Sequence, residues 1–155
     1  LAGYAAALEA GARPEGEPVA PEGTIPLAVV GAHLSGMPLN HELTSRNAVF
    51  LKATTTAPDY RFYALAGTVP PKPGLLRVET GKGEKIAVEV WALTPEAFGT
   101  FVAGIPAPLG IGTLTLDDGT PVKGFLVEAE AVKGARDISS YGSWRAFMAD
   151  VAKAS

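Results

Sequence analysis

The chain has 155 residues, of which 47% are hydrophobic and 19% are charged, with a formal net charge of −3 and no cysteine. This composition is typical of one soluble globular domain with a real core, and it excludes a disordered chain. The lack of cysteine excludes disulfides, thiolate catalysis and cysteine-ligated metals, and without a basic run we expect no nucleic-acid partner. The apolar stretches are too short to span a bilayer, so we expect no membrane contact and a cytoplasmic protein.

The first 24 residues are predicted to lie outside the folded domain. Residues 1–12 are rich in alanine and place Leu1, Tyr4 and Leu8 at helical spacing, which predicts a short docking helix. Residues 13–23 are rich in Pro, Gly and Glu and cannot bury much surface, as is typical of a linker. We therefore expect the domain to occupy residues 25–155, and the initial leucine predicts a fragment or a processed product.

Strands are predicted where apolar or β-branched residues run together or alternate. These segments are residues 25–32, 49–55, 60–65, 75–79, 85–93, 113–116 and 122–130. The first is apolar throughout, which indicates a strand buried on both faces. In residues 85–93, alternation predicts Ile86 on one face and Glu89 with Trp91 on the other. The Asp-Asp-Gly sequence at residues 117–119 is a strong hairpin signal.

Helices are predicted after residues that cap helix N-termini. Asn40 is the expected N-cap of a short helix within residues 37–46. Thr94, followed by Pro95, predicts the next helix start. Ser143 is the expected cap of a helix over residues 144–152, whose apolar residues recur at i, i+3, i+4 and i+7.

Two further segments are predicted to be irregular. Residues 67–74 hold three prolines and two glycines, which predicts a stiff extended loop. Residues 105–112 should end the preceding helix. Strands joined by hairpins, without strict βαβ alternation, predict an α+β domain with a mixed, largely antiparallel sheet rolled up and helices outside it. Patterning alone leaves open whether the sheet closes into a barrel.

The segment with the most chemical potential follows the first predicted strand. It reads GAHLSGMPLN over residues 31–40 and can present backbone N–H groups and one titratable side chain to a cavity. His33 is the acid/base candidate there. The alternative is a histidine that hydrogen-bonds to the backbone at the strand end. His33 and His41 have no suitably spaced carboxylate partners, so we expect no metal site and no cofactor.

Several side chains could bind an anionic ligand. Arg61, Arg77 and Lys123 are candidate cations, and Lys72 stands out because its proline-rich loop fixes its position. A solvated loop lysine is the alternative for Lys72. Tyr60 can offer a hydroxyl group or simply pack.

Residues 31–40 resemble the motif that opens the C-terminal domain of allophanate hydrolases. Further segments resemble that family in the same order: TAPDYRFYAL at 56–65, PPKPG at 70–74, IPAPLGIG at 105–112 and VKGF at 122–125. The resemblance runs from residue 25 to about residue 149. It implies a γ-glutamyl cyclotransferase-like fold, a small mixed, largely antiparallel β-barrel with flanking helices.

The resemblance also implies a role in urea degradation, the conversion of allophanate to ammonia and CO2. The complete hydrolase has an N-terminal amidase domain with a Ser-Ser-Lys triad, which is absent here and is an expected partner. Amidase action leaves N-carboxycarbamate, a small anionic substrate that the C-terminal domain is expected to decarboxylate. In the alternative, this domain is not an enzyme and supports assembly or stability, for example in a homo-oligomer.

The resemblance assigns the site to the loop and its surroundings. His33 is the expected catalytic acid. The expected substrate-binding residues are Gly31, Ala32, Leu34, Asn40, Tyr60, Lys72, Pro73 and Gly74. Cyclotransferases use a glutamate after the main helix, but residues 105–112 contain no carboxylate. Cyclotransferase activity is therefore not expected.

Overall fold

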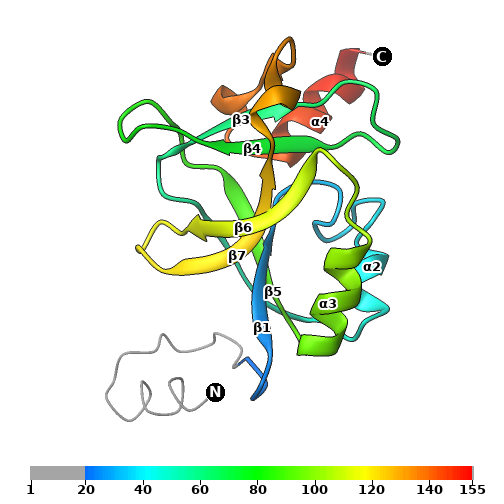
Figure 1. Ribbon diagram of the computed structural model, residues 1–155. Coiled ribbons are helices and arrows are strands. Elements are labelled where there is room, and N and C mark those ends of the chain that lie inside the picture. The colour runs from blue at the N-terminus through cyan, green and yellow to red at the C-terminus, as the bar shows by residue number, and fades with distance from the viewer. Residues whose placement is uncertain (1–19, 155) are drawn as a thin grey trace.

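The computed structural model describes residues 20–154, in which the strands form two sheets (Figure 1). The five-stranded sheet has the order β2-β5-β1-β7-β6, with β1 Ile25–Val29, β2 Val49–Thr55, β5 Ala87–Leu93, β6 Leu109–Thr115 and β7 Pro121–Val127. The three-stranded sheet has the order β4-β3-β8, with β3 Tyr60–Ala64, β4 Pro73–Arg77 and β8 Arg136–Asp137. The predicted α+β class is confirmed, with the ladders divided between two sheets.

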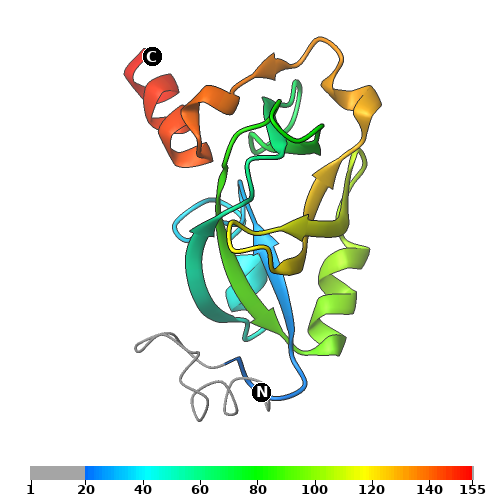
Figure 2. The same ribbon diagram turned by 90° about the vertical axis from the view of Figure 1, so that its left-hand side faces the viewer.

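Five helical segments complete the described part of the chain. They are α2 His41–Thr44, α3 Pro95–Ala103, α4 Trp144–Ala154 and the 3-10 turns η1 Ala129–Val132 and η2 Ser139–Tyr141. α3 and α4 lie at opposite ends of the molecule (Figure 2). No helix within residues 20–154 is long and apolar enough to cross a membrane. The predicted helix over residues 1–12 lies outside the described residues.

β1 is the central strand of the larger sheet. It pairs antiparallel with β5 and parallel with β7, the one parallel pairing among the described strands. Leu27 and Val29 on one face and Ala28 on the other are fully buried, as an apolar strand covered on both faces requires. β1 ends three residues earlier than predicted because Gly31 begins a series of turns, in which the Leu34 N–H donates to the Gly31 carbonyl.

Most of the local signals in the sequence are confirmed. The Thr94 hydroxyl accepts a hydrogen bond from the Ala97 N–H, and Ser143 caps α4 by accepting from the Ala146 N–H. β6 and β7 form the predicted hairpin, in which Gly119 has a φ of 87°. A positive φ of this kind suits glycine, which carries no Cβ.

Two predictions about local structure were wrong. Asn40 precedes α2 but its side chain makes no cap, because its Nδ2 donates to the His33 carbonyl instead. β6 begins at Leu109, inside the segment predicted to be irregular, because its partner β7 extends the ladder that far. Glu89 and Trp91 lie within β5 and are both buried.

The two sheets approach each other most closely where β4 meets β7. A Cβ atom added to Gly74 would lie 2.8 Å from the Cβ of Val127. Glycine is required here by the separation of two backbones and not by its φ angle. This contact brings the proline-rich loop that precedes β4 against the larger sheet, where the candidate site lies.

Replacing Gly74 with alanine should therefore destabilise the fold. We expect the free energy of unfolding to fall by about 1–3 kcal/mol, the usual cost of overpacking a core. Urea denaturation measures this change. Gly110→Ala is the matched control, because nothing lies within 4 Å of a Cβ built at that strand position. Equal stability of Gly74→Ala and Gly110→Ala would contradict the packing argument.

Candidate active site

A cavity of about 210 Å³ lies beside the end of β1. Four parts of the chain line it: residues 30–33 after β1, Leu39 and Glu42 at α2, residues 69, 70, 72 and 73 at the start of β4, and residues 104–106 after α3. Leu109 and Phe125 complete the wall. Apolar residues and polar groups both line the walls, and three of the lining residues are ionisable: His33, Glu42 and Lys72. This composition suits a small charged ligand held by few polar groups.

His33 is held between aromatic rings. Its imidazole stacks on Phe125 with the centroids 5.1 Å apart and meets Phe101 edge-on at 5.0 Å. Its Nε2 lies 2.7 Å from Oε1 of Glu42, and the His33 side chain is 12% exposed. The ring is therefore fixed on several sides and accessible from the cavity.

Burial lowers the pKa of His33 below its usual 6.5, and Lys72 and His41 act in the same direction. The hydrogen bond and negative charge of Glu42 oppose this shift without cancelling it. At neutral pH, His33 is therefore a neutral imidazole. A carboxylate oxygen accepts hydrogen bonds, so Nε2 of the neutral ring carries the hydrogen that is donated to Glu42. Nδ1 then carries the lone pair.

This shift predicts how stability depends on pH. The folded state binds a proton at His33 less readily than the unfolded chain, so the stabilisation is complete above pH 6.5 and is lost as pH falls through the lower folded-state pKa. Urea denaturation from pH 7.5 to 5 should show a smaller loss of stability in His33→Gln than in the native chain. Parallel losses in the two proteins would contradict the assignment.

The turn that carries His33 depends on Gly31. A Cβ at Gly31 would lie 2.3 Å from Cδ of Pro73, so only glycine lets the turn and the start of β4 meet there. The Leu39 N–H donates to the Ala32 carbonyl at 2.8 Å, which closes the loop over α2. Gly31, Ala32 and Pro73, three of the residues predicted to bind substrate, line the cavity.

Lys72 lies in the rim loop predicted to be stiff. Its N–H donates to the Thr68 hydroxyl at 2.9 Å, and its carbonyl accepts from the Leu65 N–H at 3.1 Å. Among the ion pairs of residues 20–154, none involves the Lys72 ammonium. Its charge is close enough to depress the pKa of His33. A cation and an imidazole thus share one small cavity.

The sequence model of the allophanate hydrolase C-terminal domain matches residues 25–149, most of the chain. The chain belongs to the allophanate hydrolase C-terminal domain family. It is 43% identical over 131 residues to the urea amidolyase of Saccharomyces cerevisiae, covering 83% of this chain. The chain spans only 7% of the length of that relative.

Comparison with solved structures agrees with this family assignment. The allophanate hydrolase of Kluyveromyces lactis is 40% identical with a TM-score of 0.80, over 83% of this chain and 21% of that one. A uropathogenic Escherichia coli-specific protein is 33% identical with a TM-score of 0.75, over 81% of this chain and 96% of that one. An aig2-like protein from Mus musculus, 17% identical with a TM-score of 0.52 over 70% of this chain and 82% of that one, shows the fold alone.

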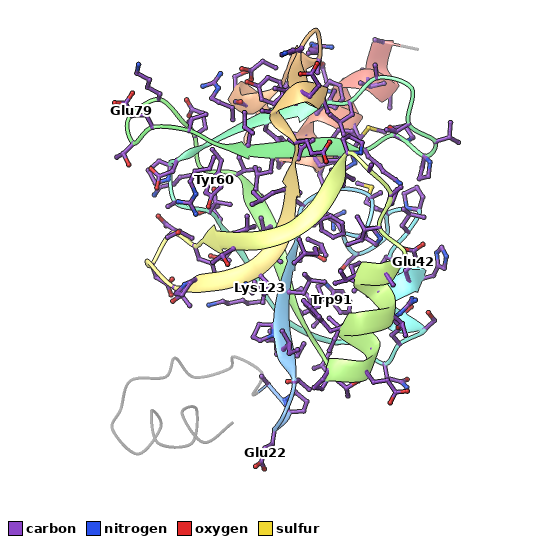
Figure 3. The ribbon with its side chains drawn as sticks, viewed as in Figure 1. Glu22, Glu42, Tyr60, Glu79, Trp91 and Lys123 are labelled. Carbon is purple, nitrogen blue, oxygen red and sulfur yellow. The ribbon has the colours of Figure 1, made fainter. Side chains whose placement is uncertain are left out.

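Four residues predicted to bind substrate do not line the cavity of this allophanate hydrolase C-terminal domain. Leu34 is buried in the core. The Asn40 side chain donates a hydrogen bond to the His33 carbonyl. Gly74 packs on Val127. Tyr60 lies on the other side of the molecule from Glu42 (Figure 3).

The position of Tyr60 follows from alternation along β3. Tyr60 and Phe62 both point into the core and are fully buried. The Tyr60 hydroxyl accepts a hydrogen bond from the Thr115 N–H at 2.9 Å, and Arg77 lies over the ring. A buried tyrosine whose hydroxyl has a backbone partner has a structural role here.

The other candidate cations also have partners away from the cavity. Arg61 bonds to Asp137 with Nη2 at 2.8 Å from Oδ2, and Arg77 donates to the Thr113 carbonyl. The Lys123 ammonium donates to the Thr113 hydroxyl. Of the four cations considered from the sequence, only Lys72 lines the cavity.

Glu42 and the two phenylalanines around His33 were missed by sequence reasoning. Glu42 follows His33 by nine residues, and only the turns of the loop bring the two side chains together. Phe101 and Phe125 come from α3 and β7, far along the chain. A single sequence carries no signal for pairings of this kind.

The buried carboxylate of Glu89 anchors the loop that carries His33. Oε1 of Glu89 accepts hydrogen bonds from the Ser35 N–H at 2.9 Å, the Ser35 hydroxyl at 2.9 Å and the Trp91 indole at 3.2 Å. Arg145 of α4 donates to Oε2 at 3.0 Å and to the Ser35 carbonyl at 2.7 Å. Burial raises the pKa of Glu89, but these hydrogen bonds outweigh burial and leave the pKa below its ordinary value. The carboxylate is therefore ionised at neutral pH.

Proposed function

We propose that this domain serves urea degradation as the C-terminal part of an allophanate hydrolase and decarboxylates N-carboxycarbamate in the His33 cavity. Family membership supports the pathway, and one observation carries the chemistry. His33, whose imidazole is held by aromatic rings, and Lys72, whose ammonium makes no ion pair among residues 20–154, line the same small cavity. No carboxylate occupies residues 105–112, which argues against a cyclotransferase reaction.

The substrate suits these two groups. N-carboxycarbamate is a dianion with two carboxylates on one nitrogen, so Lys72 can hold one carboxylate while the other leaves. As the C–N bond breaks, its electron pair passes to the nitrogen, which takes the proton of the His33 imidazolium. The products are CO2 and carbamate, and His33 becomes a neutral imidazole. Proton donation of this kind contributes about 10²–10⁴-fold to a rate.

The lowered pKa of His33 fits this role once the ligand is considered. Burial disfavours the imidazolium, whereas a dianion in the cavity favours the charged form. Binding of substrate should therefore be accompanied by proton uptake. The acid is then formed only when there is a substrate to protonate.

The proposed reaction needs a source of N-carboxycarbamate, which an amidase domain acting on allophanate supplies in the cytoplasm. The great length of the S. cerevisiae relative leaves room for such a domain.

A second role, in assembly, is favoured by a separate observation. Val49 and Phe50 on the edge strand β2 are 37% and 40% exposed, and an apolar sheet edge is a surface for docking another subunit or domain.

Binding of malonate tests the proposed site. Malonate has the same two carboxylates on one central atom and loses no CO2 under these conditions. Isothermal titration at pH 7.5 in two buffers of different ionisation enthalpy should show binding with proton uptake. Lys72→Gln should weaken binding by roughly 10- to 100-fold, because a hydrogen bond to a charged group contributes about 1.5–3 kcal/mol.

The control for this titration is Lys133→Gln, which removes an exposed lysine paired with Glu130. It should bind malonate like the native chain. Absence of binding to the native chain, or equal affinities for the two lysine variants, would refute the proposed anion site.

A further inference from the structure

The proposed reaction requires the His33 ring to stay in one position beside the substrate nitrogen, and this inference rests on that proposed function. His33 lies in a series of turns and not in a helix or strand, so no regular ladder of backbone hydrogen bonds fixes its position. A displacement of about 1 Å within a site can cost about 10²-fold in rate. The contacts that hold these turns therefore bear on the reaction.

Ser35, two residues after His33, is held by side chains from two other elements. The Glu89 carboxylate of β5 accepts hydrogen bonds from the Ser35 N–H and hydroxyl, each at 2.9 Å. Arg145 of α4 donates to the Ser35 carbonyl at 2.7 Å, and its Nη2 also donates to Oε2 of Glu89 at 3.0 Å. The N–H, the carbonyl and the hydroxyl of Ser35 are thus all bound by one ion pair.

We propose that Glu89 and Arg145 are positioning residues for His33, which they hold in place through Ser35. We call these two side chains, with Ser35, the Ser35 clamp. Neither Glu89 nor Arg145 lines the cavity, so neither contacts a ligand bound there. Only Leu34 separates Ser35 from His33, and planar peptide bonds leave this short segment few soft torsions. A shift of Ser35 is therefore passed on to the His33 ring.

The chemistry of the clamp suits the fixing of a conformation better than the gain of stability. The Glu89 side chain is only 10% exposed, and removing a carboxylate from water costs free energy. A buried ion pair can often be replaced by apolar residues without loss of stability. Apolar residues could not bind the N–H, the carbonyl and the hydroxyl of one residue at the same time. The ion pair is thus explained by the backbone geometry that it imposes on Ser35.

The position of Arg145 is set by the packing of α4. Trp144 and Phe147 on either side of it are 2% and 7% exposed, and Trp144 meets Phe62 of β3 edge-on at 6.3 Å. Arg145 itself is 48% exposed, so its side chain is not required to fill the core. The clamp joins residues that lie 110 positions apart in the chain. It therefore makes the geometry of the His33 loop depend on the C-terminal helix.

The position of the His33 ring can be measured by proton NMR. The ring lies 5.1 Å from Phe125 and 5.0 Å from Phe101, so the resonances of its carbon-bound protons contain ring-current shifts from both. The chain has two histidines, and the exposed His41 serves as the internal reference. At a fixed pH of 8, Arg145→Gln should shift the His33 resonances and leave those of His41 in place.

Release of CO2 from freshly generated N-carboxycarbamate by the full chain measures the effect on the reaction. Arg145→Gln should lower kcat by roughly 10- to 100-fold, the usual cost of a misplaced catalytic group. KM should change little, because Lys72 lies on a rim loop that the clamp does not contact. Glu89→Gln should lower kcat to a similar extent. The double variant should be no slower than the slower single variant, because the two residues act as one unit.

Arg61→Gln is the matched control. It also breaks a pair between an arginine and a carboxylate, since Nη2 of Arg61 lies 2.8 Å from Oδ2 of Asp137, and the Arg61 side chain is 30% exposed. That pair links β3 to β8 and contributes no residue to the cavity. Arg61→Gln should therefore keep the native kcat and the native His33 resonances.

The outcomes separate this proposal from the proposed function. If the native chain speeds CO2 release, a native kcat in Arg145→Gln overturns the clamp alone. A fall in kcat without a shift of the His33 resonances also overturns it, as does an equal fall in Arg61→Gln. A native chain without effect on CO2 release overturns the proposed function, and the His33 resonances then decide the clamp because they require no turnover. If circular dichroism shows Glu89→Gln to be unfolded, the half-exposed Arg145 still provides the test.

Discussion

Replacing His33 with asparagine should reduce the domain's acceleration of CO2 release by about 10²–10⁴-fold, the usual contribution of a positioned acid. Asparagine keeps a polar side chain but cannot donate a proton from a titratable ring. The effect should fall on kcat, because Lys72 still holds a carboxylate of the substrate. Steady-state CO2 release at several substrate concentrations measures it.

The matched control is His41→Asn. His41 is eight residues away on α2, is exposed, and has Nδ1 bonded to the Pro38 carbonyl. Its removal should change kcat by less than a factor of about 3, since a surface substitution rarely alters free energies by more than about 0.5 kcal/mol. Equal rates for His33→Asn and the native chain would exclude His33 as the acid.

Replacing Glu89 with alanine should lower the free energy of unfolding by about 3 kcal/mol. The substitution leaves the Ser35 N–H and the Trp91 indole without their acceptor, and an unsatisfied buried donor costs about 1–3 kcal/mol. The Arg145 guanidinium also loses its ion pair, but that side chain is half-exposed and water compensates it in part. Urea denaturation followed by circular dichroism measures the change.

The stabilising contribution of Glu89 also depends on pH. Burial lowers the pKa of His33, whereas hydrogen bonds lower the pKa of Glu89. The folded-state pKa of Glu89 is depressed from 4.5, so its stabilisation is present above that value and is lost as pH falls through the folded-state pKa. Glu89→Gln should therefore flatten the acid side of the stability curve. Glu79→Ala, at a largely exposed position, is the control and should cost little. A Glu89→Ala chain as stable as Glu79→Ala would contradict the network.

Local features of this fold could be predicted because their causes are local. A short continuous apolar run favours a covered strand, and a hydroxyl before Pro95 caps a helix wherever that helix packs. The position of Lys72 on a stiff rim loop was predicted for the same reason, since proline restricts the chain by itself.

Pairings across the chain could not be predicted in this way. Alternation placed Glu89 and Trp91 on one face of β5, but it cannot reveal that α4 supplies Arg145 to the Glu89 carboxylate. Tyr60 was expected at the substrate because its segment resembles the family, yet β3 turns that residue into the core. His33 was identified from its loop, whereas its partner Glu42 becomes apparent only when the turns are folded.

The most direct test of the account is CO2 release from freshly generated N-carboxycarbamate, with a separate amidase as its source, in the presence and absence of the unmodified chain. The account predicts that the chain speeds CO2 release in proportion to its concentration and that malonate inhibits the effect. The same rate with and without the chain would contradict a catalytic cavity and leave assembly as the better explanation of the domain.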